Sequence, residues 1–260
     1  MSATFHLPAL SVVGHGFFST HYTTAIDAER GVPCDGRKPK FELLVARARR
    51  FTSLVTQMHV EVCGQALAQH PPSAELRPHG IFASHHGELQ IAADLVSDLL
   101  TLKSVSSARF ALSVHNAPSG LFSIATKNTR SSTTVAAGEA SFAAGLLEAF
   151  LIAQERTLPV LLSYADEPIP AIFGGAPGQV GTAFALLLVP RGQENGSPSK
   201  GTIQLDEYDD AGSAKHDPMR AAIEVASAIE EGRAIAAKGI GRVRKGALLG
   251  LTFHPQGARP

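Results

Sequence analysis

Long apolar runs mark several predicted strands of this chain. LPVLLSYAD at 158–166 and GTAFALLLVP at 181–190 have almost no polar interruption, which is typical of strands buried on both faces. A first strand is predicted at 10–18, a short buried strand at 79–87, and others at 132–136, 202–207 and 247–255. The segment 108–126 is predicted to begin as a strand that Pro118 and Gly120 interrupt.

Apolar residues at helical spacing lie between these runs. The pattern predicts one long helix or two over 41–70, and further helices at 88–100, 139–154 and around 217–231. Loops are expected at 29–40 and 191–201, and 232–247 is a Gly-rich basic stretch. Alternating strands and helices predict an α/β fold in layers, and without a repeat or a linker we expect one domain over 1–260.

The segment STTVAAGEASFAAG (132–145) is a strand-to-helix elbow of the kind that displays nucleophiles in many α/β enzymes. It carries a carboxylate, Glu139, among very small residues. The helix that follows is apolar around nearly its whole circumference, so we expect it to be buried between layers, with its positive N-terminal end facing a cavity or an interface. Glu139 would then be a buried charge, or simply a favourable acid in the first helical turn.

Composition narrows the possible functions. The chain has 260 residues, 44% of them hydrophobic, and a formal net charge of +0, so nucleic-acid binding driven by bulk charge is not expected. Two cysteines, no secretory signal and no apolar stretch of membrane-spanning length predict a cytoplasmic protein without a membrane span. Local basic residues at Arg47, Arg49 and Arg50 are either a solvated face or a docking site.

Most motifs that could hold a metal or a cofactor are missing, and neither is expected. Adjacent histidines on a strand point to opposite faces, which argues against a metal at His85 and His86. GGAPGQVG at 174–181 precedes a strand and lacks the Lys-Ser/Thr of a phosphate-binding loop. Cys63 lies in an amphipathic segment and is expected in the core. His115 and Asn116, in SVHNAPSG, either serve the Pro118 turn or belong to a site.

The residues 108–149 (ARFALSVHNAPSG through AGEASFAAGLLEA), with GIFASHHGELQ at 80–90 and AFALLLVP at 183–190, resemble the β-ketoacyl synthase-like proteins of aryl polyene gene clusters. The chain is most similar to their chain-length-factor subunit. The likeness covers about 10–190, and 191–260 is a weaker C-terminal extension. It implies the layered α/β fold of the thiolase superfamily, truncated relative to a full ketosynthase.

The resemblance places Glu139 where condensing enzymes carry the cysteine that takes the acyl chain. A carboxylate cannot replace that thiolate, and His216 and His254 lie in no family motif. The resemblance therefore implies a subunit that is not catalytic alone and needs no cofactor. It would pair with an active β-ketoacyl synthase, as a heterodimer or larger assembly, and would meet an acyl carrier protein. The residues expected at the acyl tunnel or interface are Ser113, His115, Asn116, Leu121, Phe122, Glu139 and Phe142.

Two alternatives remain open from the sequence. Ser113 or Ser141 could act with His115 in an acyl hydrolase or transferase, since Ser113 and His115 face the same way on a strand. The chain could instead be a scaffold that binds an acidic carrier protein through Arg47, Arg49 and Arg50.

Overall fold

The computed structural model describes residues 7–45, 49, 52–70, 76–209, 217–244 and 247–257. Its strands are β1 Leu10–Ser19, β2 His79–Ala83, β3 Ser132–Val135, β4 Val160–Asp166, β5 Thr182–Pro190, β6 Gly201–Asp209, β7 Ile235–Arg244 and β8 Ala247–Pro255. Its helices are α1 Ala25–Arg30, α3 Leu54–Ala68, α4 Leu89–Leu102, α5 Ser107–Phe110, α6 Ala117–Thr126, α7 Ser141–Arg156 and α8 Pro218–Glu231, with 3-10 turns at Gly138–Ala140 and Ala171–Phe173.

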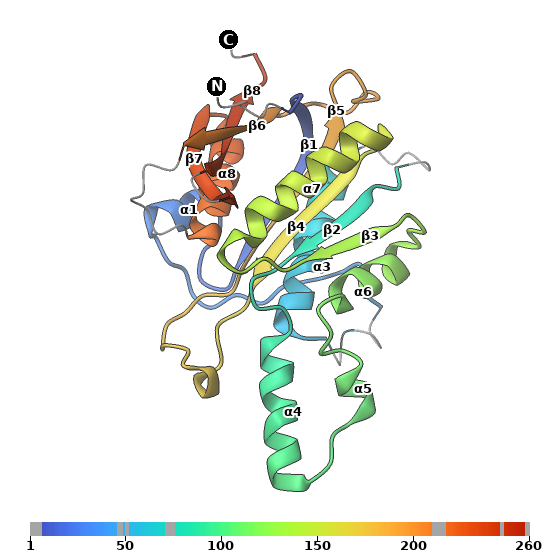
Figure 1. Ribbon diagram of the computed structural model, residues 1–260, viewed down its shortest axis with the longest axis vertical. Helices are drawn as coiled ribbons and strands as arrows, with labels where there is room; N and C mark the ends of the chain where they lie inside the picture. The colour runs from blue at the N-terminus through green and yellow to red at the C-terminus, as the bar shows by residue number, and fades with distance from the viewer. Residues whose placement is uncertain are drawn as a thin grey trace.

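The described strands form one mixed sheet in the order β3-β2-β4-β5-β1-β6-β8-β7 (Figure 1). β2 runs parallel to both β3 and β4, and the other neighbours are antiparallel. β3 is an edge strand that pairs on one side only among the described residues. The elbow therefore follows a strand at the edge of the sheet, beside its parallel part.

Helices cover both faces of the sheet, because its central strands are apolar on both sides. Along β5, Phe184, Leu186 and Leu188 face a core shared with α7 and α8. The alternate residues of β5 face a second core, shared with α3 and α6. This arrangement confirms the prediction of a layered α/β fold.

α3 lies very close to β1, and two glycines make that possible. A Cβ atom on Gly14 would overlap the carbonyl oxygen of Ala66, and one on Gly16 would overlap that of Val62. Substitution at either position would force the helix off the sheet.

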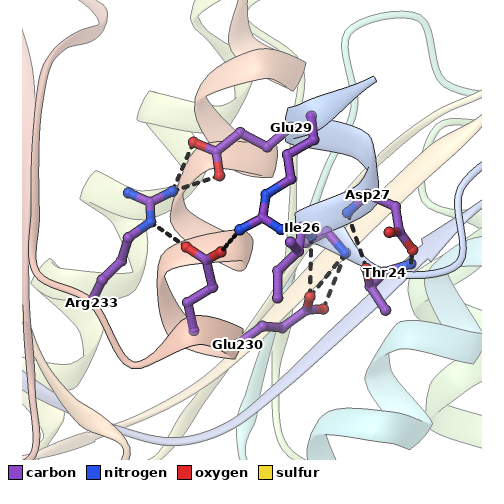
Figure 2. Close-up of polar contacts among 9 residues, drawn as sticks. Thr24, Ile26, Asp27, Glu29, Glu230 and Arg233 are labelled. Carbon is purple, nitrogen blue, oxygen red and sulfur yellow. Dashed lines mark hydrogen bonds and ion pairs between the residues drawn. The ribbon is translucent and has the colours of Figure 1, made fainter. Parts of the chain in front are cut away.

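The C-terminal residues join the same core as the rest of the chain. Ile203, Val225, Leu251 and Phe253 are buried with residues of β1, β4 and α7. Polar contacts tie α8 to α1, as Figure 2 shows: the Glu230 carboxylate accepts hydrogen bonds from the amides of Ala25 and Ile26 at 3.0–3.2 Å. The segment 191–260 thus contributes a full part of the fold, including a strand.

Besides the segment 108–126, which is described below, three predictions of secondary structure were wrong or incomplete. The Gly-rich stretch 232–247 contains β7, whose pairing with β8 shifts register between Ala237 and Gly241. Such irregular pairing hides the period-two pattern of a strand. α1 was not predicted, and residues 41–45 lie outside any helix, so 41–70 is not one long helix. None of the described helices is long and apolar enough to cross a membrane.

Candidate functional site at the elbow between β3 and α7

The elbow turns sharply after β3 and is held by its own hydrogen bonds. Gly138 has a positive φ of 58°, which favours glycine. The Ser141 hydroxyl donates to the carbonyl oxygen of Gly138 at 2.7 Å and accepts from the Ala137 amide at 2.9 Å. Ser141 is completely buried, so its hydroxyl closes the turn and is not placed to attack a substrate.

Glu139 stands at the tip of this turn, in the 3-10 segment that leads into α7, and its side chain is exposed. The expectation of a buried charge was therefore wrong for the chain by itself. α7 is also less enclosed than its sequence suggested, because Leu151 is 43% exposed. One side of the helix packs on the sheet and the other stays accessible.

Two histidines approach the elbow from the loop after β2. The Nε2 atom of His85 lies 4.0 Å from the position that a Cβ on Gly138 would take. The rings of His85 and His86 stack with centroids 3.9 Å apart. They follow the strand instead of extending it, so the expectation that they face opposite sides was wrong. In the described residues, no group of three or more His, Cys, Asp or Glu could hold a metal ion.

One carboxylate fixes this histidine loop. Asp166 Oδ1, at the end of β4, accepts hydrogen bonds from the Ser84 hydroxyl at 2.7 Å and from the amides of His85 and His86 at 2.9 and 3.1 Å. Burial, the neighbouring His85 and the opposing effect of Asp166 leave the pKa of His86 below its usual value. The imidazole of His86 is therefore neutral near pH 7.

His115 reaches the same region from the turn before α6. Its Nε2 atom lies 3.3 Å from the carbonyl oxygen of Val135, the last residue of β3. Its ring packs directly over Gly87, where any Cβ would overlap Nδ1. The structure thus brings His85, His86 and His115 close to the elbow, a grouping that sequence spacing alone did not show.

The segment 108–126 is helical, which corrects the predicted strand. α5 and α6 occupy it, and Pro118 lies in the first turn of α6, where its missing N–H costs no hydrogen bond. Ser113 lies in the turn between them and donates to the Phe110 carbonyl at 2.9 Å. The strand geometry proposed for a Ser113–His115 pair is therefore absent. Asn116 is exposed at the start of α6.

The apolar residues expected at a tunnel are separated by the sheet. Phe122 is 2% exposed and packs on Phe82 with ring centroids 5.5 Å apart, in the core below α3 and α6. Phe142 is fully buried in the other core, 5.5 Å from Tyr164. Phe122 and Phe142 are core residues of this chain, whereas Leu121 is half-buried.

Cys63 is not a candidate for the missing nucleophile. It is fully buried on α3, and burial raises the pKa of its thiol to about 12. Cys34 lies in the loop after α1, where its amide donates to the His21 carbonyl at 2.7 Å. The prediction of a core role for Cys63 is confirmed.

The basic cluster proposed for docking is only partly described. Arg47 and Arg50 lie outside the described residues, as does His216. The guanidinium of Arg49 donates to the carbonyls of Leu44 and Glu42 at 2.6 and 3.2 Å and lies over the Phe41 ring. Arg49 is thus engaged with its own chain. His254 is exposed on β8.

Sequence reasoning missed a buried acidic pair at the base of α4. Glu88 is 4% exposed and accepts from the Thr56 hydroxyl at 2.6 Å, and Glu167 is 6% exposed and accepts from the Gln90 amide at 2.9 Å. Burial, with Glu88 nearby, raises the pKa of Glu167 to about 7. A cavity of about 430 Å³ opens beside Glu167 and Arg109. Glu88 is the first residue of the predicted helix 88–100 and Glu167 follows the predicted strand 158–166, and their polar types gave no burial signal.

Comparison with known families supports the resemblance. Residues 24–239 match the family model of the β-ketoacyl synthase N-terminal domain. No curated protein matches the sequence.

Several solved structures share the fold over almost the whole chain. The complex of the ketosynthase ApeO with its chain length factor ApeC from Xenorhabdus doucetiae matches with 20% identity, 95% of this chain, 99% of that chain and a TM-score of 0.70. The ishigamide ketosynthase/chain length factor matches with 14% identity, 96% and 100% coverage and a TM-score of 0.69. AntDE:AntF, a type II polyketide acyl-carrier protein in complex with its ketosynthase, matches with 11% identity, 96% and 99% coverage and a TM-score of 0.72. The fold is therefore the thiolase-like fold of ketosynthases, in a chain shorter than a full ketosynthase.

Proposed function

Because the chain belongs to the β-ketoacyl synthase family, as its N-terminal domain type, we propose that it is a chain-length-factor subunit. It pairs with an active β-ketoacyl synthase in aryl polyene biosynthesis, shapes that partner's acyl tunnel and does no condensation chemistry itself. The matched solved structures support the pairing, since they are assemblies of a ketosynthase with its chain length factor.

The observation that carries this proposal is Glu139 at the tip of the elbow. In the condensing enzymes that the sequence resembles, a cysteine at this place holds the acyl chain as a thioester. A carboxylate attacking a thioester would give a mixed anhydride, and it is a far weaker nucleophile than a thiolate. This chain has a carboxylate at the tip of its elbow and therefore lacks that nucleophile.

A partner surface is supported by apolar side chains on the α4–α5 arm, which we define as residues 89–114. Figure 1 shows this arm projecting away from the sheet and its covering helices. Of the thirteen exposed large hydrophobic residues described, seven lie on the arm: Val96, Leu99, Leu100, Leu102, Val105, Phe110 and Val114. Exposed apolar residues gathered in this way mark an interaction site. The arm has about the 20–30 residues that each side of a standard interface contributes.

The edge of β3 that does not pair with β2 is a second candidate for contact with the partner. The carbonyls of Ser131 and Val135 accept hydrogen bonds from β2, so by strand alternation the backbone groups of Ser132 and Thr134 face away from the sheet. An unpaired edge invites a strand from another chain. A ketosynthase with the same fold has a matching edge to offer.

Mass spectrometry of the reconstituted pair tests the proposal. We expect that incubation with an acyl-carrier thioester labels the ketosynthase and leaves this chain at its unmodified intact mass. Glu139→Gln should support the same product formation as the wild type, because the carboxylate performs no covalent step. The ketosynthase alone should be inactive or give products of altered length.

A stable acyl adduct on this chain, or condensation by this chain without the ketosynthase, would overturn the proposal. Leu121 and Phe142 give a further control on the tunnel. Leu121→Ala, at a half-buried position, should lengthen the products of a folded pair. Phe142→Ala should instead cost about 3–5 kcal/mol of stability, because it empties a packed core position.

A further inference from the structure

Four cations meet where the parallel strands of the sheet begin. Arg77 precedes β2, Lys127 and Arg130 lie between α6 and β3, and Arg156 ends α7 just before β4. Because β2, β3 and β4 run parallel, their starting ends share one edge of the sheet. All four side chains are exposed, and no ion pair holds any of them in the described part of the chain.

Hydrogen bonds hold the loops that carry these cations together. Arg77 donates to the Thr129 hydroxyl at 3.4 Å, and the buried Asn128 donates to the Pro78 carbonyl at 2.9 Å. Asn128 also accepts from the Arg130 amide at 3.0 Å. The Ser131 hydroxyl lies 3.0 Å from His79 Nδ1. Burial and the charge of Arg156 lower the pKa of His79. These bonds connect the segments that carry Arg77, Lys127 and Arg130, and the His79 amide donates to the Pro159 carbonyl at 2.9 Å, which joins the loop after Arg156 to β2.

An apolar side chain accompanies the cations. Ile124 is 77% exposed, the highest value among the exposed large hydrophobic residues described. It lies three residues before Lys127, whose amide donates to the Ile124 carbonyl at 3.4 Å. We call Arg77, Ile124, Lys127, Arg130 and Arg156 the basic patch. Two acidic residues lie beside it in sequence: Glu155 next to Arg156, and Glu75, outside the described residues, two positions before Arg77.

We propose that the basic patch docks the acyl carrier protein that serves the complex. Carrier proteins are acidic, and a cationic surface beside an exposed apolar side chain fits an acidic amphipathic helix. Non-specific binding to a nucleic acid comes instead from phosphate contacts, to which an apolar side chain adds little. This proposal rests on the proposed function for the identity of the partner. It places docking on a different surface from Arg49, whose guanidinium is engaged with its own chain.

A two-fold axis between the two subunits would bring the basic patch near the reactive site of the ketosynthase. If two sheets of the same fold join through their β3 edges about a two-fold axis, the two edge strands run antiparallel. The start of β3 in this chain then lies beside the end of β3 in the ketosynthase, where the partner's elbow and its nucleophile stand. A carrier protein on the basic patch is thereby held close to the partner's reactive site.

The test measures binding of the purified apo carrier protein to the chain alone and to its complex with the ketosynthase. We expect Lys127→Glu/Arg130→Glu to weaken binding at least about 10-fold and to reduce its dependence on salt. Ile124→Ser should weaken it several-fold without changing the salt dependence. Lys38→Glu/Arg220→Glu alters the net charge equally at exposed positions elsewhere and should leave binding unchanged.

Three results would overturn the proposal. One is equal loss of affinity in the control variant, and another is unchanged affinity in Lys127→Glu/Arg130→Glu. The third is tighter binding of duplex DNA or of phosphatidylglycerol vesicles than of the carrier protein, lost in the same variant. Co-elution with the ketosynthase is measured separately for every variant. Failure of the wild type to co-elute refutes the proposed function, whereas normal co-elution with unaltered carrier binding refutes the docking surface.

Discussion

Helices α1 and α4 both begin beneath a carboxylate that comes from a distant part of the chain. Glu230 accepts from the Ala25 and Ile26 amides at the start of α1, and Glu167 accepts from the Gln90 amide at the start of α4. Each carboxylate satisfies donors that a helix cannot satisfy itself. Beyond this shared device, the two helices are used in opposite ways.

Ion pairs between residues of opposite charge hold α1 against the C-terminal end of α8. Arg233 bridges Glu29 and Glu231, and Arg30 reaches Glu231, as Figure 2 shows for the labelled residues. α4 leads outward into the arm, whose seven exposed large apolar residues find no cover within the described chain. The difference teaches that one end of the molecule completes its own contacts, while the other leaves apolar side chains exposed, as the proposed partner surface requires.

The largest difference is expected in the pH dependence of stability. Glu167 is nearly fully buried, and its pKa of about 7 exceeds the ordinary value of 4.5. The folded state therefore keeps its proton where the unfolded state loses it, so stability falls as pH rises from about 4.5 to 7 and is level above that. The loss for this group is at most about 3 kcal/mol.

Urea unfolding at pH 5, 6, 7 and 8 measures this loss. Glu167→Gln should flatten the profile, because the amide cannot ionise but can still accept from Gln90. Glu230→Gln serves as the matched control: burial raises the pKa of Glu230 too, but its side chain is only half-buried. Equal slopes for the wild type and Glu167→Gln would show that this carboxylate ionises freely.

The second largest effect is expected on pairing. Leu99→Ser/Leu100→Ser/Phe110→Ser should weaken the complex with the ketosynthase by about 30- to 100-fold, since buried apolar anchors dominate interfaces. Stability of the chain alone should change by about 0.5 kcal/mol or less, because these side chains are 53%, 64% and 61% exposed.

Val32→Ser/Ile172→Ser/Phe173→Ser removes exposed apolar residues outside the arm, at 55%, 59% and 46% exposure. Analytical ultracentrifugation of both triple variants with the ketosynthase separates the effects. If the two triples weaken pairing equally, the arm is not the partner surface.

Sequence patterns predicted the body of the fold better than its edges. Strands such as β4 and β5 are apolar on both faces, and a short continuous apolar run of this kind is typical of a strand covered on both sides. α6 was missed because Pro118 and Gly120 were read as interruptions of a strand, although proline is favoured in a first helical turn. The elbow was located correctly, but its surroundings were not. His85, His86 and His115 come together only through the loop pinned by Asp166 and the space above Gly87.

Burial of charge was the least predictable property. One of the two readings of Glu139 from the sequence made it a buried charge, yet Glu139 is exposed in a first helical turn while Glu88 and Glu167 are buried. A glutamate is buried when other segments bring donors to it, and those donors come from α3 and the start of α4. The residues around positions 88 and 167 carry no pattern from which these distant hydrogen-bond donors could be predicted.

The contacts of Glu230, Arg30 and Arg233 that join α1 to α8, which we call the clip, should contribute to stability and not to pairing. Glu230→Gln replaces one of the two acceptor oxygens by an NH2 group, which cannot accept from the Ala25 and Ile26 amides, so we expect a loss of about 1–2 kcal/mol. Thermal unfolding of the chain alone measures the loss, and the affinity for the ketosynthase should be unchanged. Weakened pairing in this variant would contradict the division between a closed end and a partner end.

The smallest effects separate two arginines of almost equal exposure. The side chains of Arg233 and Arg109 are 36% and 37% exposed, and each bridges two carboxylates: Glu29 and Glu231 in the clip, Asp94 and Asp98 in the arm. Exposed salt bridges contribute little to the free energy of unfolding, so Arg233→Met and Arg109→Met should each cost less than about 1 kcal/mol of global stability.

The local consequences of the two substitutions should differ. Arg233 joins Glu29 from 204 residues away, so its loss lowers the unfolding midpoint slightly and evenly. Arg109 ties α5 to α4 over 11 and 15 residues, so its loss frees the arm alone. Hydrogen exchange should then quicken in 89–114 and nowhere else. Pairing should weaken a few-fold, because the ketosynthase must now order the arm as it binds. Uniform exchange in Arg109→Met with undiminished pairing would mean that the arm holds its shape without this bridge.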